Sequence, residues 1–573
     1  MKFLSSLILL GAAAVNAIPT DSSDSSDNKP PSSTAPSVRI TNGTVTGIYN
    51  PQWKQDFFLS IPYAEPPMGN LRFRPPQYIQ TKRNVVAQAY GPHCYGYGSD
   101  QWGFNVSEDC LTLNVIRPAG VKSNAKLPVA VWIHGGGFVE GGAGDPRYNL
   151  TWLVNQSVNL GTPMIAVSMN YRVAGWGFLS SRQVANSHNL NIGMKDQRLA
   201  LHWVKENIAA FGGDASKVTI FGESAGAFSV SMHQIAFGGR DDKLFRGAIM
   251  ESGSAIFYQA WGYPDAYQQN YDALLDAVNC TDAVDSLQCL RGVEVGKLND
   301  ALNTTNAAVF TAVVDDAFVP DSPASAYREG RYVKVPTIIG TNDDEGCSFG
   351  ELGLNTTEQI YGYLLATTKY KNSTIDRLLE IYNESVSVPD ASNFTHPDEG
   401  SMLFGSQYHR TAAIVGDQFF IHGKRFIAQR LSHDNVNVWA YRFRARPNGF
   451  ADWFRAGHFS EVSFVFYNLH SEGYDIGFVW PGESVDPMGG PDAEKYRALS
   501  DFMSKSWVRF VVSGDPSVGI DAKKDVKWLK YKDGTGASQI VFDIAPNSSY
   551  METDDYRKEG IQLMIDSMMQ NGE

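Results

Sequence analysis

The chain has 573 residues, of which 43% are hydrophobic and 19% charged, and its formal net charge at pH 7 is −13. This composition is ordinary for a soluble globular protein, and the length exceeds one typical domain, although a large α/β enzyme can build around one extended sheet. The negative charge argues against a nucleic-acid partner, because phosphate binding needs a basic surface.

The N-terminus, "MKFLSSLILLGAAAVNAIPT", has the layout of a secretory signal peptide. Lys2 supplies a positive start, residues 3–15 an apolar core, and small residues precede Ala17. We expect residues 1–17 to be a signal peptide cut near Ala17; the alternative is an N-terminal anchor. The apolar run is too short to span a bilayer and no later segment is longer, so we expect no stable membrane insertion.

Residues 18–37 consist of Ser, Asp and Pro with almost no apolar side chains. Such a segment buries too little surface to offset its ordering entropy, so we predict a disordered leader. From residue 38 to residue 573 the composition is globular, which predicts a single domain.

Two features agree with an oxidising secretory route. The cysteines fall as Cys94 with Cys110 and Cys280 with Cys289, and neighbours in sequence are the simplest disulfide pairs, which leaves Cys347 as a free, buried thiol. N-x-S/T sequons are frequent and suit a glycosylated surface. They lie at Asn42, Asn105, Asn149, Asn155, Asn279, Asn303, Asn355, Asn372, Asn383, Asn393 and Asn547.

Apolar strand-like runs alternate with helical stretches along the chain. This alternation predicts an α/β protein with a mostly parallel core sheet, whose functional groups gather after the strand C-termini. The expected strands are "LPVAVWI" (127–133), "TPMIAVSMNYR" (162–172), "KVTIFG" (217–222), "VPTIIGTN" (335–342) and "NVNVWAYRF" (435–443), and a helix is expected over 191–211, before a double glycine.

Ser224 lies in "FGESAGAF", between the third expected strand and a helix. A serine needs a base to take its proton, and a sharp strand–turn–helix junction with Gly222 and Gly226 is the setting of a nucleophile elbow. The alternative is a serine that happens to lie between two turn glycines, so the decision depends on partners elsewhere. The following helix would place backbone N–H groups near a developing oxyanion.

The run Gly135–Gly137 follows another buried-looking strand. Glycines there leave bare amides facing a substrate carbonyl, and the amide of Ala225 would complete an oxyanion hole. The alternative is a flexible loop. It is disfavoured because the same chain also carries the serine motif around Ser224.

These motifs resemble the type-B carboxylesterase/lipase family, which includes cholinesterases and fungal lipases. "FFLSIPYAEPPMGNLRFRPPQ" (57–77) and "SEDCLTLNV" (107–115) resemble two family signatures, "GESAGAFSV" (222–230) the serine elbow, and "GMKDQRLALHWVKENIAAFGGD" (193–214) a strongly patterned helix. The resemblance covers roughly residues 38 to 560 and implies an α/β-hydrolase fold with a large, mostly parallel sheet flanked by helices.

The resemblance also implies a catalytic triad in the order Ser, acid, His, with oxyanion donors at Gly136, Gly137 and Ala225. "GTNDDEG" resembles the acid motif and gives Glu345, although Asp343 and Asp344 are competitors on chemistry alone. "RAGHFSEVSFVF" (455–466) resembles the histidine motif and gives His458. His134 and His202 are interpreted as structural.

Three further residues match family positions near the site. Glu223 precedes the nucleophile, Ser252 lies in "ESGSA", and Glu461 lies three residues beyond His458. Each is equally well explained as a satisfied buried polar group. No second histidine at helical zinc spacing accompanies His458 and Glu461, so we expect no metal and no other cofactor.

The loop between Cys94 and Cys110 corresponds to the family loop over the active-site gorge, and it is shorter than the lids of fungal lipases. A short lid cannot cover a large apolar mouth, which favours small or medium soluble esters. Trp102 in this loop either stacks on a cationic substrate or packs. Phe459 stands where the family has a small residue, and it either narrows the pocket or points away from it.

The sequence therefore predicts a secreted serine carboxylic-ester hydrolase that takes a small-molecule ester and forms an acyl-enzyme on Ser224. Alternatives are a triacylglycerol lipase, a cholinesterase-like esterase, and a non-catalytic binding protein of the same fold. The sequence does not indicate the oligomeric state.

Overall fold

The structure is a computed structural model, and it describes residues 35–256, 262–305, 310–315, 317–383, 404–474, 485–521, 525–532, 536–544 and 548–570. The predicted signal peptide, nearly all of the predicted leader, and the sequons at Asn393 and Asn547 lie outside these residues.

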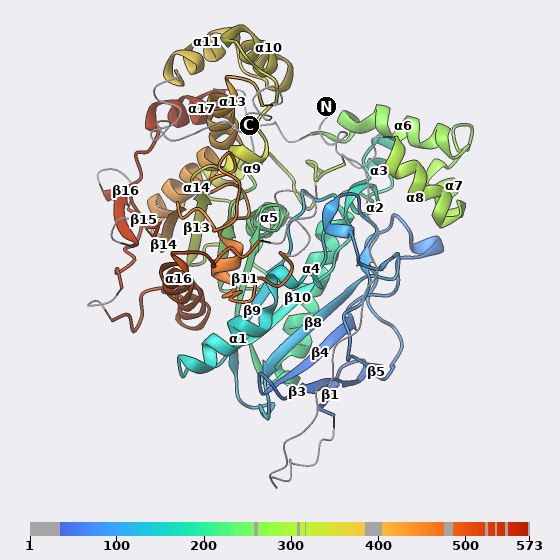
Figure 1. Ribbon diagram of the computed structural model, residues 1–573. Coiled ribbons are helices and arrows are strands. Elements are labelled where there is room, and N and C mark those ends of the chain that lie inside the picture. Colours follow the sequence, from blue (N-terminus) through green and yellow to red (C-terminus); the bar gives the residue numbers. More distant parts are fainter. Residues whose placement is uncertain are drawn as a thin grey trace.

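An 11-stranded sheet crosses the molecule (Figure 1). Its central strands, from β10 to β15, run parallel, and antiparallel strands complete both edges, so the predicted mostly parallel sheet is confirmed. In spatial order the strands are β16 (Tyr550–Thr553), β15 (Ser538–Phe542), β14 (Val438–Phe443), β13 (Thr337–Asn342), β12 (Gly247–Glu251), β11 (Gly213–Glu223), β9 (Leu127–Ile133), β10 (Ile165–Met169), β8 (Thr112–Pro118), β4 (Gln55–Pro62) and β3 (Ile48–Asn50).

Two small sheets lie outside the large one. One has the order β1 (Ser37–Ile40), β2 (Gly43–Thr46) and β5 (Val85–Val86), and the other pairs β6 (His93–Cys94) with β7 (Val106–Ser107). The second pair closes the base of the loop between Cys94 and Cys110.

The large sheet is buried on both faces, as expected for parallel strands covered by helices. In β9, Val129, Val131 and Ile133 enter one core, while Ala130 and Trp132 enter the other. Helices α4, α5 and α14 pack on one face of the sheet, and α1 and α16 on the opposite face (Figure 1). Continuous apolar runs such as "VAVWI" follow from this double burial.

The helices have the following bounds: α1 Leu150–Asn159, α2 Ala174–Phe178, α3 Arg182–Asn186, α4 Ile192–Asn207, α5 Ala225–Gly239, α6 Gln268–Ala277, α7 Ser286–Gly292, α8 Val295–Thr304, α9 Pro323–Arg328, α10 Thr357–Thr367, α11 Asn372–Ile381, α13 Tyr408–Gly416, α14 His422–His433, α15 Val462–Val465, α16 Ala493–Ser513 and α17 Lys558–Gln570. The expected helix over 191–211 is confirmed as α4 followed by a 3-10 turn over Ile208–Phe211. It stops at Gly212, whose φ of 92° only glycine adopts readily.

Both predicted disulfides are formed, Cys94 with Cys110 and Cys280 with Cys289, and Cys347 is a buried free thiol. No sequon asparagine in the described part of the chain is buried. Where the chain is described, it contains no helix long and apolar enough to cross a membrane.

The topology brings distant parts of the chain to one edge of the sheet. Ser224 directly follows β11, Ser252 follows β12, Glu345 comes three residues after β13, and His458 lies in the connection that leaves β14. Because the carboxyl ends of parallel strands meet at one edge, these segments converge there.

Candidate active site

Ser224 sits on a sharp turn between β11 and α5. Its backbone has φ 54° and ψ −125°, a conformation that a residue with a side chain rarely adopts and that costs roughly 1–3 kcal/mol. The turn is held because the Ser224 amide donates to the Glu251 carbonyl of the neighbouring strand at 2.9 Å. Ser224 is partly exposed.

The two glycines of the elbow are required by close backbone approach. A Cβ at Gly226 would lie 2.0 Å from the Ile133 carbonyl oxygen at the end of β9, and one at Gly222 would lie 2.6 Å from that oxygen. No side-chain rotation relieves contacts with a backbone carbonyl. The G-x-S-x-G pattern therefore reflects the packing of α5 against β9.

The glycine run after β9 faces the start of α5. Gly136 and Gly137 have φ of 90° and 61°, and a Cβ at Gly135 would lie 3.1 Å from the Ser224 Cβ. Within the described residues, the amides of Gly136, Gly137 and Ala225 have no hydrogen-bond acceptor. Three unpaired donors beside Ser224 can stabilise an oxyanion.

His134 directly precedes the glycine run, and contacts with Tyr171 hold it in place. Its ring stacks on Tyr171 at 4.3 Å between centroids, and the Tyr171 hydroxyl donates to the His134 carbonyl at 2.9 Å. Burial lowers the pKa of His134 to about 3, so the ring stays neutral.

His458 and Glu345 are hydrogen-bonded partners. His458 Nδ1 lies 2.6 Å from Glu345 Oε2, and the other carboxylate oxygen of Glu345 accepts the Asn342 amide at 2.6 Å. Both side chains are largely buried. Glu345 therefore holds the imidazole with Nε2 directed away from the acid, which is the orientation of a general base.

The two competing aspartates bind elsewhere. Asp343 accepts a hydrogen bond from Arg442 at 2.7 Å. Asp344 clamps the loop before His458, since its amide donates to the Ala456 carbonyl at 3.0 Å and its carboxylate accepts the Ala456 amide at 3.3 Å. Neither contacts the imidazole as Glu345 does.

His458 Nε2 is buried and has no hydrogen-bond partner among the described residues, Ser224 included. Glu223 Oε1 lies 3.2 Å from this nitrogen, without hydrogen-bond geometry. A catalytic hydrogen bond between serine and histidine often forms only when substrate binds. The absence of a bond from His458 Nε2 to Ser224 is therefore compatible with His458 as the base that deprotonates Ser224. Glu223, at the end of β11, therefore lies beside the imidazole.

Four buried glutamates form a cluster that reaches His458: Glu223 and Glu345 lie beside its ring, Glu461 interacts with it electrostatically, and Glu251 interacts with Glu223 and Glu461. Burial and then the neighbouring carboxylates raise the pKa of Glu223 and of Glu251 well above the ordinary value. Burial, with the Glu345 charge next, raises the pKa of Glu461 to about 7. Neutral carboxyls at these positions avoid repulsion that one imidazole cannot balance.

Hydrogen bonds hold this cluster in place. Ser252 Oγ donates to Glu461 Oε1 at 3.0 Å, and Asn342 Nδ2 donates to Glu461 and, at 2.8 Å, to the Gly457 carbonyl. Trp507 Nε1 donates to Glu251 at 2.8 Å. Ser252 and Glu461 are thus hydrogen-bonded to each other, and Asn342 connects Glu461 to the Gly457 carbonyl next to His458.

Asn342, Glu251 and Trp507 were not predicted from the sequence. Asn342 lies inside the quoted "GTNDDEG", and its place at a strand end was an available signal. Glu251 had the same signal, since it ends β12 and begins the quoted "ESGSA". Trp507 has none, because only packing of α16 against β12 brings its indole to the carboxylate. Phe349 and Phe420, whose ring centroids lie 5.0 and 4.7 Å from that of His458, were missed for the same reason.

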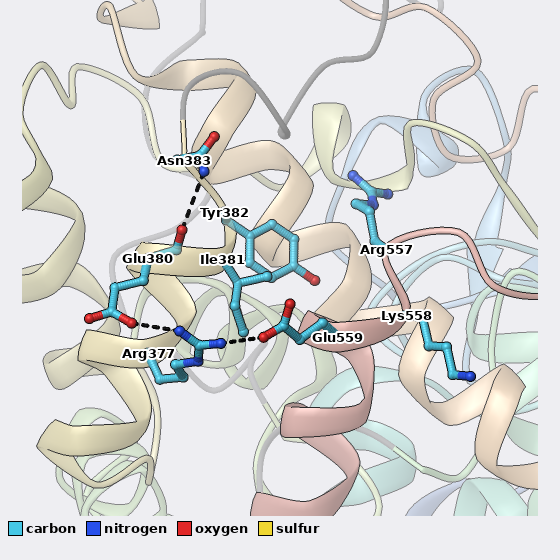
Figure 2. Close-up of a pocket in the computed structure, with 8 residues that line it drawn as sticks. All are labelled: Arg377, Glu380, Ile381, Tyr382, Asn383, Arg557, Lys558 and Glu559. Atoms are coloured by element: carbon cyan, nitrogen blue, oxygen red, sulfur yellow. Dashed lines mark hydrogen bonds and ion pairs between the residues drawn. The ribbon is translucent and has the colours of Figure 1, made fainter.

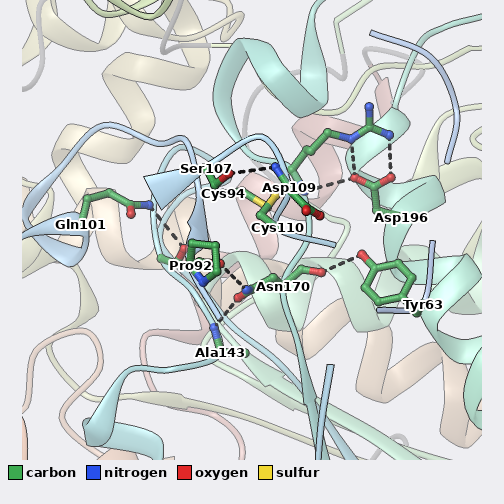
Figure 3. The surroundings of a disulfide bond; sticks show 12 residues. Tyr63, Pro92, Cys94, Gln101, Ser107, Asp109, Cys110, Ala143, Asn170 and Asp196 are labelled. Atoms are coloured by element: carbon green, nitrogen blue, oxygen red, sulfur yellow. Dashed lines mark hydrogen bonds and ion pairs between the residues drawn. A yellow bond between two sulfur atoms is a disulfide. The ribbon is translucent and has the colours of Figure 1, made fainter. Parts of the chain in front are cut away.

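Asn170 anchors the disulfide-closed loop to the sheet (Figure 3). Its side chain accepts the Ala143 amide at 2.8 Å and donates to the Pro92 carbonyl at 2.9 Å, which joins the loop base to the end of the glycine run. Trp102 at the loop tip is 63% exposed. Phe459 lies under the Arg147 guanidinium, with 4.9 Å between the guanidinium carbon and the ring centroid.

A cavity of about 340 Å³ lies far from Ser224 in sequence and topology, between α11 and α17 (Figure 2). Arg377 lines it and pairs with Glu380 at 2.7 Å and with Glu559, so these opposite charges satisfy one another. Among the described residues, no serine, cysteine or histidine lines it. The described residues also contain no group of three or more His, Cys, Asp or Glu side chains that could hold a metal ion.

Comparison with known proteins decides the family. A profile described as the carboxylesterase family matches residues 34–562. The chain belongs to the carboxylesterase family. It is a carboxylic ester hydrolase of the α/β-hydrolase fold, and the resemblance stated from the sequence is confirmed.

Individual relatives agree with this assignment. Lipase 2 of Geotrichum candidum is 32% identical over 568 residues, covering 91% of this chain and 93% of the relative. Secreted triacylglycerol lipase LIP1 of Gibberella zeae is 30% identical over 564 residues, covering 92% and 89%. The crystal structure of Aspergillus niger EstA matches with a TM-score of 0.78 and 25% identity, covering 93% of this chain and 98% of that one.

Replacing Gly226 by Ala tests the packing origin of the elbow. The new methyl group would meet the Ile133 carbonyl at 2.0 Å, so we expect strong destabilisation, on the order of 3 kcal/mol or loss of soluble protein. Gly362→Ala in α10 is the matched control, because nothing lies within 4 Å of its added methyl group and helical Ala is favoured by about 0.5–1 kcal/mol. Equal stability of the two variants in urea unfolding would contradict the packing argument.

Replacing Glu461 by Gln should change how the free energy of unfolding depends on pH. The pKa of Glu461 is about 7 in the folded state against an ordinary 4.5, so the unfolded chain loses this proton first and folding stability falls as pH rises from about 4.5 to about 7. Glu461→Gln lacks this loss of stability. Relative to the wild type, its free energy of unfolding should therefore rise across that pH window by on the order of 2–3 kcal/mol.

Urea unfolding at pH 5 and at pH 8 measures the gain, and the exposed Glu206→Gln is the control. A difference between wild type and Glu461→Gln that is the same at both pH values would refute the assignment of this titration to Glu461.

Proposed function

We propose that this enzyme hydrolyses carboxylic esters through Ser224 as nucleophile, His458 as general base and Glu345 as the acid that orients the base. The observation that carries the proposal is the 2.6 Å contact of His458 Nδ1 with Glu345, at the sheet edge where the strained Ser224 turn is presented. A base held by an acid beside a serine on an exposed turn is the arrangement that activates a hydroxyl.

The proposed reaction begins when Ser224 Oγ attacks the ester carbonyl and its proton passes to His458 Nε2. The tetrahedral oxyanion is stabilised by the amides of Gly136, Gly137 and Ala225, which have no other described acceptor. His458 then protonates the leaving alcohol, which leaves an acyl-enzyme on Ser224. Water, deprotonated by His458, attacks the acyl carbon, and the acid is released as Ser224 regains its proton.

Glu345 stabilises the imidazolium that forms in both halves of this cycle. Ser252, Glu461 and Asn342 support it indirectly, because Asn342 contacts both Glu461 and the Gly457 carbonyl next to His458. We assign Glu223 to the wall beside Nε2, where its raised pKa keeps the carboxyl neutral near a transferring proton.

Small or medium soluble esters are the proposed substrates. The support is the loop between Cys94 and Cys110, which is short and hydrogen-bonded to the segment that follows the glycine run. The Tyr97 amide donates to the Val139 carbonyl at 2.8 Å, and Gln101 Nε2 to the Gly141 carbonyl at 3.3 Å. A loop bound in this way does not act as a mobile lid over an apolar mouth.

Triacylglycerol hydrolysis is the second candidate. It is favoured by the relatives, since the Gibberella zeae protein is named a secreted triacylglycerol lipase and the Geotrichum candidum protein a lipase.

Secretion is part of the proposal. The N-terminal sequence has the layout of a signal peptide, two disulfides are formed, and the described sequon asparagines are not buried. Two relatives are named as secreted lipases.

Ser224→Ala should abolish ester turnover while the urea unfolding curve stays unchanged, because the hydroxyl makes no described hydrogen bond that the fold needs. Glu345→Gln should lower kcat by about 10³–10⁴ through loss of the imidazole orientation, and Asp344→Asn by much less. A fluorophosphonate probe should label the wild type on the peptide that contains Ser224. Turnover by Ser224→Ala, or a larger loss from Asp344→Asn than from Glu345→Gln, would overturn the assignment.

The acyl preference follows from the tied loop. We expect kcat/KM on p-nitrophenyl esters, measured from acetate to palmitate below their solubility limits, to peak at short or medium chains, without a rate jump when triglyceride emulsions form. A long-chain optimum with strong activation at the emulsion interface would contradict this preference and favour triacylglycerol hydrolysis as the function.

A further inference from the structure

Arg147 joins three parts of the chain that are far apart in sequence. It lies in the 3-10 turn Pro146–Tyr148, after the glycine run, and is 4% exposed. Its guanidinium donates to both carboxylate oxygens of Asp145, at 3.1 and 2.9 Å through Nε, and to Asp100 at 2.5 Å through Nη2. Asp100 belongs to the loop between Cys94 and Cys110. The guanidinium thus holds this loop by a partly buried ion pair.

The guanidinium also contacts the segment that carries His458. Its central carbon lies 4.9 Å from the ring centroid of Phe459, the residue directly after His458. Phe459 has φ 72°, a left-handed conformation that is strained for a residue with a bulky side chain. Such a conformation persists only where the surroundings hold the side chain, and here the cation over the ring and two apolar clusters packed against Phe459 do so.

We infer that Arg147 is a positioning residue that couples the Cys94–Cys110 loop to the imidazole of His458 through Phe459. This inference rests on the proposed function of His458. The left-handed turn at Phe459 sets the direction of the chain on leaving His458, so the place of the Phe459 ring limits where the imidazole can lie.

The same loop is also connected by hydrogen bonds to the segment that carries the oxyanion donors Gly136 and Gly137. The Asp100 amide donates to Glu140 Oε2 at 2.7 Å, and the Glu140 amide donates to the Gly136 carbonyl at 3.1 Å. One short segment around Asp100 therefore contacts both the glycine run and, through Arg147, the imidazole segment. The site is assembled when this loop is in place, and displacement of the loop would disassemble it.

The alternative is that Arg147 only stabilises the fold. A structural role predicts a lower melting temperature with an unchanged kcat per active site. A positioning role predicts a lower kcat with little change in KM, because ester binding does not require the imidazole to be aligned.

The test compares Asp100→Asn and Phe459→Leu with a matched control. Asp100→Asn removes the charge that Arg147 binds in the loop, and Phe459→Leu removes the aromatic face while retaining bulk. Glu108→Gln is the control, because Glu108 lies in the same loop and pairs with buried Arg72 at 2.6 Å without reaching the imidazole segment. Arg147→Met is informative only if it folds, since it leaves Asp145 buried without its cation.

We expect Asp100→Asn and Phe459→Leu each to lower kcat about tenfold on p-nitrophenyl butyrate with KM unchanged within about twofold, as for a small misplacement of a catalytic group. Active sites are counted by fluorophosphonate titration. The double variant should be no slower than the slower single variant, because both changes break one chain of contacts. Glu108→Gln should lower the melting temperature and keep kcat within about twofold.

A second readout does not depend on turnover. The proton shared by His458 Nδ1 and Glu345 gives a downfield one-dimensional NMR resonance, which Asp100→Asn should shift or broaden and Glu108→Gln should not. An active wild type whose Asp100→Asn variant keeps its kcat and this resonance would contradict the coupling. A wild type that hydrolyses no ester contradicts the proposed function instead, and the resonance then still decides the coupling.

Discussion

The approach of α5 to the end of β9 is the constraint on which the site depends. Gly226 packs so close to the Ile133 carbonyl that no side chain fits between them, and this contact forces the turn that strains Ser224. The same approach brings the glycine run after β9 beside the first turn of α5, where unpaired amides collect. Nucleophile and oxyanion donors are thus two consequences of one backbone contact.

The second determinant is the group of buried glutamate side chains near His458. Glu223, Glu251, Glu345 and Glu461 form a buried cluster that reaches His458, and burial with mutual repulsion keeps the pKa of three of them above the ordinary value. Asn342, Ser252 and Trp507 satisfy part of their hydrogen-bonding capacity. The result is a site in which Glu345, held by the Asn342 amide, is the acid in direct contact with Nδ1 of the imidazole.

The loop between Cys94 and Cys110 belongs to this assembly rather than only covering it. Its disulfide and Asn170 fix its base (Figure 3). Asp100 contacts Arg147, and Arg147 lies over Phe459. This explains why an aromatic residue occupies the position after His458. The ring points to a cation, so it leaves the space beside the imidazole to Phe349 and Phe420.

The sequence by itself determined the strand and helix order, the elbow and the disulfide pairs, because periodic burial, turn glycines and short cysteine spacing are local properties. It also determined the family, and through the family the proposal of Ser224, Glu345 and His458. It could not choose among Asp343, Asp344 and Glu345 on chemistry, nor orient Phe459, nor find Glu251 and Trp507. Those depend on which segments meet at the sheet edge, and only the tertiary packing of β12, β13, α16 and the loop after β14 brings those side chains together.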